Sequence, residues 1–333
     1  MANRFWVGGT GTWDAINILN WSTTTGGVGG ASVPNTADFA VFNALSGGGT
    51  VTIAYTPVVF GFQVSGYAGT IDFAGYVVKT GGNASTIFAQ DTATSWAGTP
   101  IVELTYTGAT GTRTISAVSG ANEAKAVSFR ILGGTDTIAT GSGRSLKNLD
   151  FTGFAGTLTN TTRNIYGSLT LTAGMTLTAG ANATTFAATS GTNTVTTNGK
   201  TLDFPLTFNG IGGTFAFQDA LTQGSTRAFT ITNGTVQLKA GVTSTVGSLT
   251  TSTTNQKFLQ SSLAGTKATL SQITGIVSTG YLTIKDINAT GGATFNAYTV
   301  NSNVNAGNNL GWDFFAQLGK TIFTRRKEKR VLI

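Results

Sequence analysis

The sequence has 333 residues, of which 40% are hydrophobic and only 10% charged, against roughly 25% charged in an ordinary soluble domain. It contains no Cys and no His, which excludes disulfides, thiolate zinc sites, imidazole bases and Ser-His-Asp triads. The formal net charge is +7, but the segment from Lys320 onward carries six basic residues and one acidic residue. The positive charge therefore belongs to the C-terminal segment and does not indicate a nucleic-acid surface along the body.

The first 50 residues form an aromatic and Gly-rich opening. Phe5, Trp6, Trp13 and Trp21 gather there, and the start has no basic region followed by an apolar stretch. A secretory signal is therefore not expected, and no run approaches the roughly 18 apolar residues of a membrane helix. The terminal coil of a stacked protein must cover apolar core that no further coil covers, and large rings do so. We interpret residues 1–50 as a cap.

Residues 51–310 alternate apolar residues with Thr in short runs that Gly and Asn interrupt, as in 168–172 and 281–284. This period of two predicts half-buried strands and an all-β fold. Two architectures fit: a β-solenoid, similar to a parallel β-helix, or repeats of a β-sandwich. Asn198-Gly199 and Asn233-Gly234 are candidate turns, and residues 121–126 are the nearest approach to a helix, of one or two turns at most.

A short phrase, an apolar residue and a small residue followed by Gly-Thr, recurs along this body. Its glycines are Gly69, Gly98, Gly156, Gly213 and Gly265. The spacings are close to one or two multiples of roughly 26 to 29 residues, a period typical of stacked repeats. Stacked coils place the same corner above itself, so the phrase favours the solenoid and predicts one repeated corner at which Gly avoids a Cβ clash.

The stack is expected to close with the Asn-rich segment 303–312 and its last residue, Trp312, and residues 311–333 form the closing segment and a basic tail. Apolar residues bracket the tail's charges, which favours a docking peptide whose apolar ends are buried and whose charges meet acidic neighbours. Its candidate residues are Lys320, Ile322, Phe323, Arg325, Arg326, Lys327, Lys329, Arg330, Val331, Leu332 and Ile333.

The opening Arg4–Asp14, the Asn20-Trp21-Ser22 segment, the phrases 66–71 and 153–158 and the closing Asn309–Trp312 resemble Gly/Thr-rich virion proteins of tailed bacteriophages. The resemblance covers most of the chain up to about Trp312 and leaves out the basic tail. It implies a β-solenoid on the surface of a virion, as a tail fibre, a tail spike or a capsid decoration. It also implies synthesis in the cytoplasm of a bacterial host and release by lysis.

Catalysis without His or Cys would rest on carboxylates, as in glycoside cleavage, which needs two carboxyl groups about 5 to 9.5 Å apart. Asp72 and Glu103 are separated by close to the length of the repeat unit, so adjacent coils would place them near one edge. Chance explains this spacing, and we expect no enzyme, no cofactor and no metal. Gly199-Lys200-Thr201 lacks the first glycine of a P-loop and is interpreted as a turn that opens a strand.

The leading hypothesis is a non-enzymatic structural protein of a bacteriophage particle, held by its C-terminal tail to other capsid or tail proteins. A homotrimer is expected, because elongated β proteins bury open edges by association around an axis. The exposed aromatic residues leave open the binding of a host surface glycan. The alternatives are a tail spike that binds or cleaves carbohydrate and a bacterial surface adhesin; neither a membrane nor a nucleic acid is an expected partner.

Overall fold

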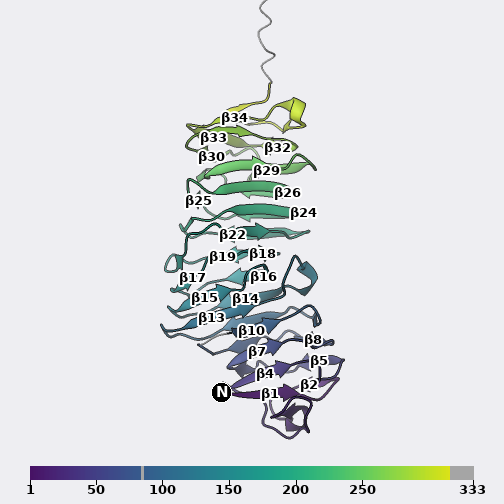
Figure 1. Cartoon of the computed structure of the whole chain (residues 1–333). Coiled ribbons are helices and arrows are strands. Elements are labelled where there is room, and N and C mark those ends of the chain that lie inside the picture. The colour runs from purple at the N-terminus through teal and green to yellow at the C-terminus, as the bar shows by residue number, and fades with distance from the viewer. Residues whose placement is uncertain (84–85, 316–333) are drawn as a thin grey trace, which may run out of the picture.

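The structure is a computed structural model that describes residues 1–83 and 86–315. It confirms an all-β solenoid of about 12 turns, in which parallel strands of successive coils stack in register. Figure 1 shows the coils rising in sequence order from the N-terminus at one end to the last strands at the other. The protein is therefore a rod whose two ends are also the two ends of the described chain.

Two sheets begin at the N-terminal end of the rod and stop before its last coils. One has nine strands in the spatial order β20 (Thr176–Leu177), β17 (Thr157–Leu158), β15 (Thr137–Thr140), β13 (Thr112–Ser116), β10 (Thr86–Gln90), β7 (Gly61–Val64), β4 (Asp38–Phe42), β1 (Ala2–Trp6) and β3 (Trp21–Ser22). The other has four, in the order β11 (Ser95–Ala97), β8 (Thr70–Asp72), β5 (Thr50–Ile53) and β2 (Gly11–Trp13). Stacking thus begins with β1 and β2, inside the segment interpreted as a cap.

The largest sheet has fifteen strands and runs along nearly the whole rod. Twelve follow one path: β35 (Val304–Asn305), β32 (Leu282–Lys285), β29 (Lys257–Ser261), β26 (Ala228–Leu238), β24 (Leu206–Phe217), β21 (Thr184–Phe186), β18 (Arg163–Ile165), β16 (Arg144–Asp150), β14 (Val127–Ile131), β12 (Ile101–Leu104), β9 (Val78–Thr80) and β6 (Val58–Val59). Three more pair beside it: β19 (Leu169–Thr170), β22 (Thr192–Thr196) and β28 (Ser248–Thr251).

Two small sheets complete the C-terminal half. The five-stranded sheet contains β23 (Thr201–Leu202), β25 (Thr222–Gln223), β27 (Thr243–Thr245), β30 (Ala268–Gln272) and β33 (Ile287–Gly291). The three-stranded sheet contains β31 (Ile276–Ser278), β34 (Thr294–Asn296) and β36 (Trp312–Asp313). Helical structure in the described residues is limited to three 3₁₀ turns, η1 (Ile18–Asn20), η2 (Glu123–Lys125) and η3 (Thr299–Asn301). The single turn of η2 confirms the brief helix expected in residues 121–126.

The coils vary in length more than the repeat phrase predicted. One turn of chain separates Phe295 from its partner Trp312, and a much longer one separates Thr86 from its partner Thr114. The first coil is longer still, with Ala2 beside Asp38. Loops at the corners of a solenoid can differ in length without disturbing the strands. The coils therefore do not share the constant length of roughly 26 to 29 residues that the phrase predicted.

The prediction that the Gly-Thr phrase marks one stacked corner is wrong. Thr70 opens β8 of the four-stranded sheet, Thr157 opens β17 of the nine-stranded sheet, and Thr214 lies inside β24 of the fifteen-stranded sheet. Two copies do share a local geometry. A Cβ on Gly69 would lie 2.3 Å from the carbonyl oxygen of Gly49, and one on Gly156 would lie 2.0 Å from that of Asp136. There Gly is required by the close approach of the coil below.

The two Asn-Gly candidates behave differently. Asn198 and Gly199 both have positive φ values, of 48° and 75°, and lead directly into β23 at Thr201. This confirms Gly199-Lys200-Thr201 as a turn that opens a strand. Asn233-Gly234 lies inside β26, so the expected turn is wrong there. Gly234 takes a φ of 79° and bends that strand, which continues on both sides of it.

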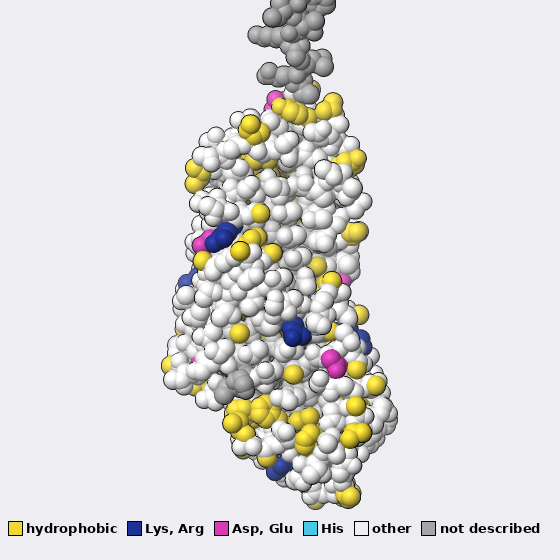
Figure 2. Space-filling model, in the orientation of Figure 1, with side chains coloured by type: hydrophobic (Ala, Val, Ile, Leu, Met, Phe, Trp, Pro, Cys, Tyr) yellow, Lys and Arg dark blue, Asp and Glu magenta, His cyan; other side chains and the backbone are white. Residues whose placement is uncertain are grey.

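One apolar core runs along the inside of the rod from Trp6 to Phe314. Stacking in register places like residues above one another, as for Phe186, Phe208 and Phe229 in β21, β24 and β26, whose ring centroids are 5.1 and 5.0 Å apart. Each such contact contributes about 0.5 to 1.5 kcal/mol beyond burial. Figure 2 shows that charged side chains on the face in view are few and scattered.

Three cations are buried in this core, which the low charge content did not predict. The first, Arg113, is fully buried and donates from Nε and Nη2 to the Asp136 carboxylate, each at 2.8 Å. Arg163 is 3% exposed and donates to the carbonyl oxygen of Thr159 at 2.5 Å. No ion pair of Arg163 occurs among the described residues, and burial lowers its pKa to about 10. The third, Lys257, lies beside a surface groove.

Candidate functional site

The predicted aromatic residues at the N-terminal end come together, with one exception. Trp6, Trp13 and Trp21 are fully buried and meet around Phe42, with Trp21 lying 5.3 Å from Trp6 and 5.2 Å from Trp13 between ring centroids. Phe5 is half-buried and lies outside this cluster of tryptophans, because its position in β1 alternates with that of Trp6.

The chain itself closes this end. Residues between β2 and β4 fold beneath the first coil, where β3 pairs antiparallel with β1 and places Trp21 opposite Trp6. In Figure 1 this segment forms the irregular loop below β1. The very short β3 and its loop cover the edge of β1, whereas β2 and β6 end their own sheets and pair on one side only among the described residues.

The C-terminal end is different. Trp312, the remaining predicted aromatic residue, is only partly buried and packs against Phe295 at 5.1 Å. The last strands, β35 and β36, each pair on one side only among the described residues. Large apolar side chains are exposed around them, including Val304 at 46%, Leu310 at 56% and Phe315 at 81%. Figure 2 shows apolar atoms at this end of the rod and a larger group of them in its lower, N-terminal part.

The proposed docking tail lies outside the described residues. The described chain stops at Phe315, and all eleven candidate tail residues, from Lys320 to Ile333, follow it. The described chain ends at residue 315 at the C-terminal end of the rod, where apolar side chains and strand edges are exposed.

The carboxylate pair considered for catalysis does not form. Asp72 lies in β8 of the four-stranded sheet, beside Thr52 and Ala97, and Glu103 lies in β12 of the fifteen-stranded sheet. Glu103 is instead flanked in register by Lys79 and Arg130, with N to O distances of 3.4 and 3.0 Å. Because a glycosidase needs its two carboxyl groups around one cleft, the prediction of a shared edge is wrong.

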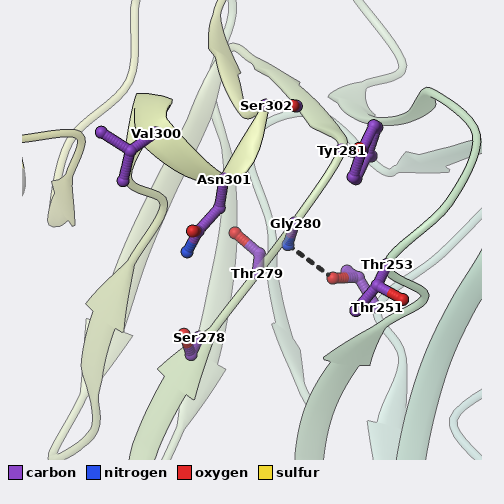
Figure 3. Close-up of a pocket in the computed structure, with 9 residues that line it drawn as sticks. All are labelled: Thr251, Thr253, Ser278, Thr279, Gly280, Tyr281, Val300, Asn301 and Ser302. Atoms are coloured by element: carbon purple, nitrogen blue, oxygen red, sulfur yellow. Dashed lines mark hydrogen bonds between the residues drawn. The ribbon is translucent and has the colours of Figure 1, made fainter.

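A groove on the flank of the last coils was not foreseen from the sequence. It has a volume of about 400 Å³ and is lined by Thr251, Thr253 and the segments 278–281 and 300–302. Figure 3 shows Asn301 and Tyr281 on opposite sides of the segment Ser278–Gly280, which also lines the groove. The Gly280 amide donates to Thr251 Oγ1 at 2.9 Å and so joins two neighbouring coils beneath the groove.

Lys257 fixes the walls of this groove from inside the protein. Its side chain is fully buried, and Nζ donates to the carbonyl oxygens of Ser252 and Gly280 at 2.9 and 3.1 Å. The same Nζ lies 5.7 Å from the centroid of the Tyr281 ring. Burial lowers the pKa of Lys257 below its ordinary value. The buried cation thus ties the loop after β28 to the loop before β32.

Sequence reasoning missed this groove because its parts are far apart in the chain. Tyr281 has a φ of 53°, a left-handed conformation that is rare for a bulky residue and that only the folded structure reveals. Within residues 1–83 and 86–315 no group of three acidic residues is placed to hold a metal ion, and no helix is long and apolar enough to cross a membrane.

The fold and the sites above define the chain as a β-solenoid with one closed end, one open end and a polar flank groove. Comparisons with protein-family models, curated proteins and solved structures give no match.

Proposed function

We propose that this chain is a non-enzymatic structural protein on the surface of a tailed-bacteriophage particle, as a capsid decoration or a fibre or spike shaft. We further propose that it is attached to other virion proteins through its C-terminal end. The observation that carries the proposal is the difference between the two ends of the rod. Apolar side chains are exposed at both ends, among them Ile16 and Val28 at one and Leu310 and Phe315 at the other. The N-terminal end nevertheless buries its tryptophans completely, whereas Trp312 at the C-terminal end is only partly buried and is followed by the basic segment.

Exposed apolar side chains beside unpaired strand edges favour association with another surface. At the C-terminal end this surface is followed directly by a segment with six basic residues and flanking Ile, Phe, Val and Leu. Apolar anchors supply most of the affinity of such contacts, and charges select the partner and accelerate binding. The partner implied is a virion protein with an acidic surface around an apolar pocket.

A passive role is supported by the chemistry along the rod. The sequence has no His or Cys, and the carboxylate of Glu103 is neutralised by two cations instead of facing a second carboxylate. The stacked core and the in-register strands provide stiffness along the axis, which suits a shaft or a surface decoration.

Truncation after Gly319 tests the attachment. We expect a soluble rod with unchanged far-ultraviolet circular dichroism that no longer enters particles assembled in infected cells, as measured by immunoblotting of purified virions. A second variant, Arg325→Glu with Arg326→Glu, should reduce incorporation about tenfold or more through charge repulsion. The matched control, Lys200→Glu with Lys239→Glu, makes the same charge change on the flank and should be incorporated normally. Normal incorporation of the truncated chain would refute the proposed attachment.

A further inference from the structure

The flank groove has neutral polar walls. The side chains of Thr253, Ser278, Asn301 and Ser302 line it without hydrogen-bond partners among the described residues, so their donors and acceptors face solvent. No carboxylate lines the groove, and the nearby cation, Lys257, is fully buried with Nζ engaged by main-chain carbonyl groups. A charged ligand would therefore find no opposite charge here, whereas a neutral ligand rich in hydroxyl groups would find several partners.

Tyr281 gives the groove its aromatic surface, and Lys257 Nζ lies 5.7 Å from the centroid of its ring. The residue is 38% exposed and has a left-handed backbone, and Lys257 Nζ donates to the carbonyl oxygens of Gly280 and Tyr281. Ser302, which also lines the groove, has a left-handed backbone too, with a φ of 61°. Such strained conformations cluster where proteins hold ligands.

A ladder of amide side chains runs along the rod and ends in the loop that carries Thr253. Asn233 Nδ2 donates to Asn209 Oδ1 at 2.6 Å, and Asn255 Nδ2 donates to Asn233 Oδ1 at 3.1 Å. The ladder climbs one coil at each step and ends at Asn255, close in sequence to Thr253 in the groove wall. Asn209 and Asn255 are exposed, so their amide groups are open to an extended ligand.

We propose that this groove binds a segment of a neutral polysaccharide, with one sugar ring on Tyr281 and hydroxyl groups on Asn301, Ser302 and Thr253. An aromatic face next to unpaired hydroxyl and amide groups complements the apolar faces and the equatorial hydroxyl groups of a sugar. A peptide is a poorer fit, because Val300 is the single large aliphatic residue in the lining. The inference goes beyond the structural role proposed above and does not depend on it.

The test uses the full-length chain and a panel of neutral hexasaccharides: maltohexaose, cellohexaose, mannohexaose and xylohexaose. Saturation-transfer NMR identifies a binding member, and titration calorimetry measures its Kd. Tyr281→Asn removes the ring and keeps a residue that tolerates the left-handed backbone. It should weaken binding about tenfold or more, whereas Tyr281→Phe should stay within about threefold. Tyr76→Asn is the matched control, since Tyr76 is 40% exposed and lies in the N-terminal half.

Binding that Tyr281→Asn weakens and Tyr76→Asn does not would support the proposal, provided the thermal midpoints of the variants agree. Asn301→Ala supplies a second test at the opposite wall, should Tyr281→Asn lower the thermal midpoint, and is expected to weaken binding several-fold. The proposal is overturned if none of the four probes binds, if Tyr281→Asn and Asn301→Ala both bind as the wild type does, or if a hexagalacturonate of the same length binds more tightly than every neutral probe.

Discussion

The buried ion pair of Arg113 and Asp136 permits a sharp test of how charge is accommodated in this core. Both side chains are completely buried, and the guanidinium group makes two bonds of 2.8 Å to the carboxylate and one of 3.0 Å to the Gly133 carbonyl oxygen. Arg113 also lies 5.8 Å from the centroid of the Phe154 ring. Arg113→Met would fill much of the same space and leave the carboxylate buried without its partner.

The expected loss in the free energy of unfolding is about 3 to 5 kcal/mol, since removing one partner of a buried pair leaves an uncompensated charge. The double variant Arg113→Met with Asp136→Leu removes both charges and should recover most of that loss. Arg163→Met is the matched control. Arg163 is also buried, but it makes no ion pair among the described residues and its pKa is already lowered to about 10. Replacing it should change stability by no more than about 1 kcal/mol.

Native-state hydrogen exchange is the suitable assay, because each coil of a solenoid contacts only its neighbours and unfolding need not be two-state. Arg113→Met should accelerate exchange in β13, β15 and β17 and leave β29, β30 and β32 protected. The reasoning would be refuted if Arg113→Met and Arg163→Met had equal effects, or if protection fell uniformly along the rod.

Two further substitutions probe the groove support and the closed end. Burial lowers the pKa of Lys257 below its ordinary value of 10.5. Between the lowered pKa and 10.5 the unfolded chain therefore binds more protons than the folded chain. Across this pH window the free energy of unfolding of the wild type should rise with pH relative to that of Lys257→Met. Parallel thermal melts of the two proteins from pH 7 to 10.5 measure the difference, and its absence would contradict the burial of a charged amine. Trp21→Ala should lower the free energy of unfolding by about 3 to 5 kcal/mol. It should expose β1 and β4 to hydrogen exchange while β32 stays protected. Unchanged protection of the first coil would contradict the assignment of Trp21 to the closed end.

The solenoid was predictable because its cause is local and repeated. Alternation of apolar residues with Thr, as in residues 281–284, is enough to define strands with one buried face. The positions of the corners were not predictable, because coils of unequal length place the same Gly-Thr phrase before β8, before β17 and inside β24. A short motif fixes the local backbone and does not fix its place in the coil.

The groove and the buried cations depend on contacts between coils. Thr251, Tyr281 and Asn301 share no sequence pattern, and only the stacking of three successive segments brings them together. Likewise, a low charge content gives no indication that Arg113, Arg163 and Lys257 lie in the core. Lys257 binds carbonyl groups of two different loops, at Ser252 and Gly280, and Tyr281 with its left-handed backbone comes directly after Gly280.

Attachment through the C-terminal end is the central claim, and the most direct test is to locate both ends of the rod on intact particles. An epitope inserted at the N-terminus and labelled with gold should appear away from the particle, at the far end of a projecting rod. Density for the last coils, with β35 and β36, should meet a capsid or tail protein in reconstructed images. Gold at the particle surface with β36 pointing outward, or particles that lack this chain, would contradict the account.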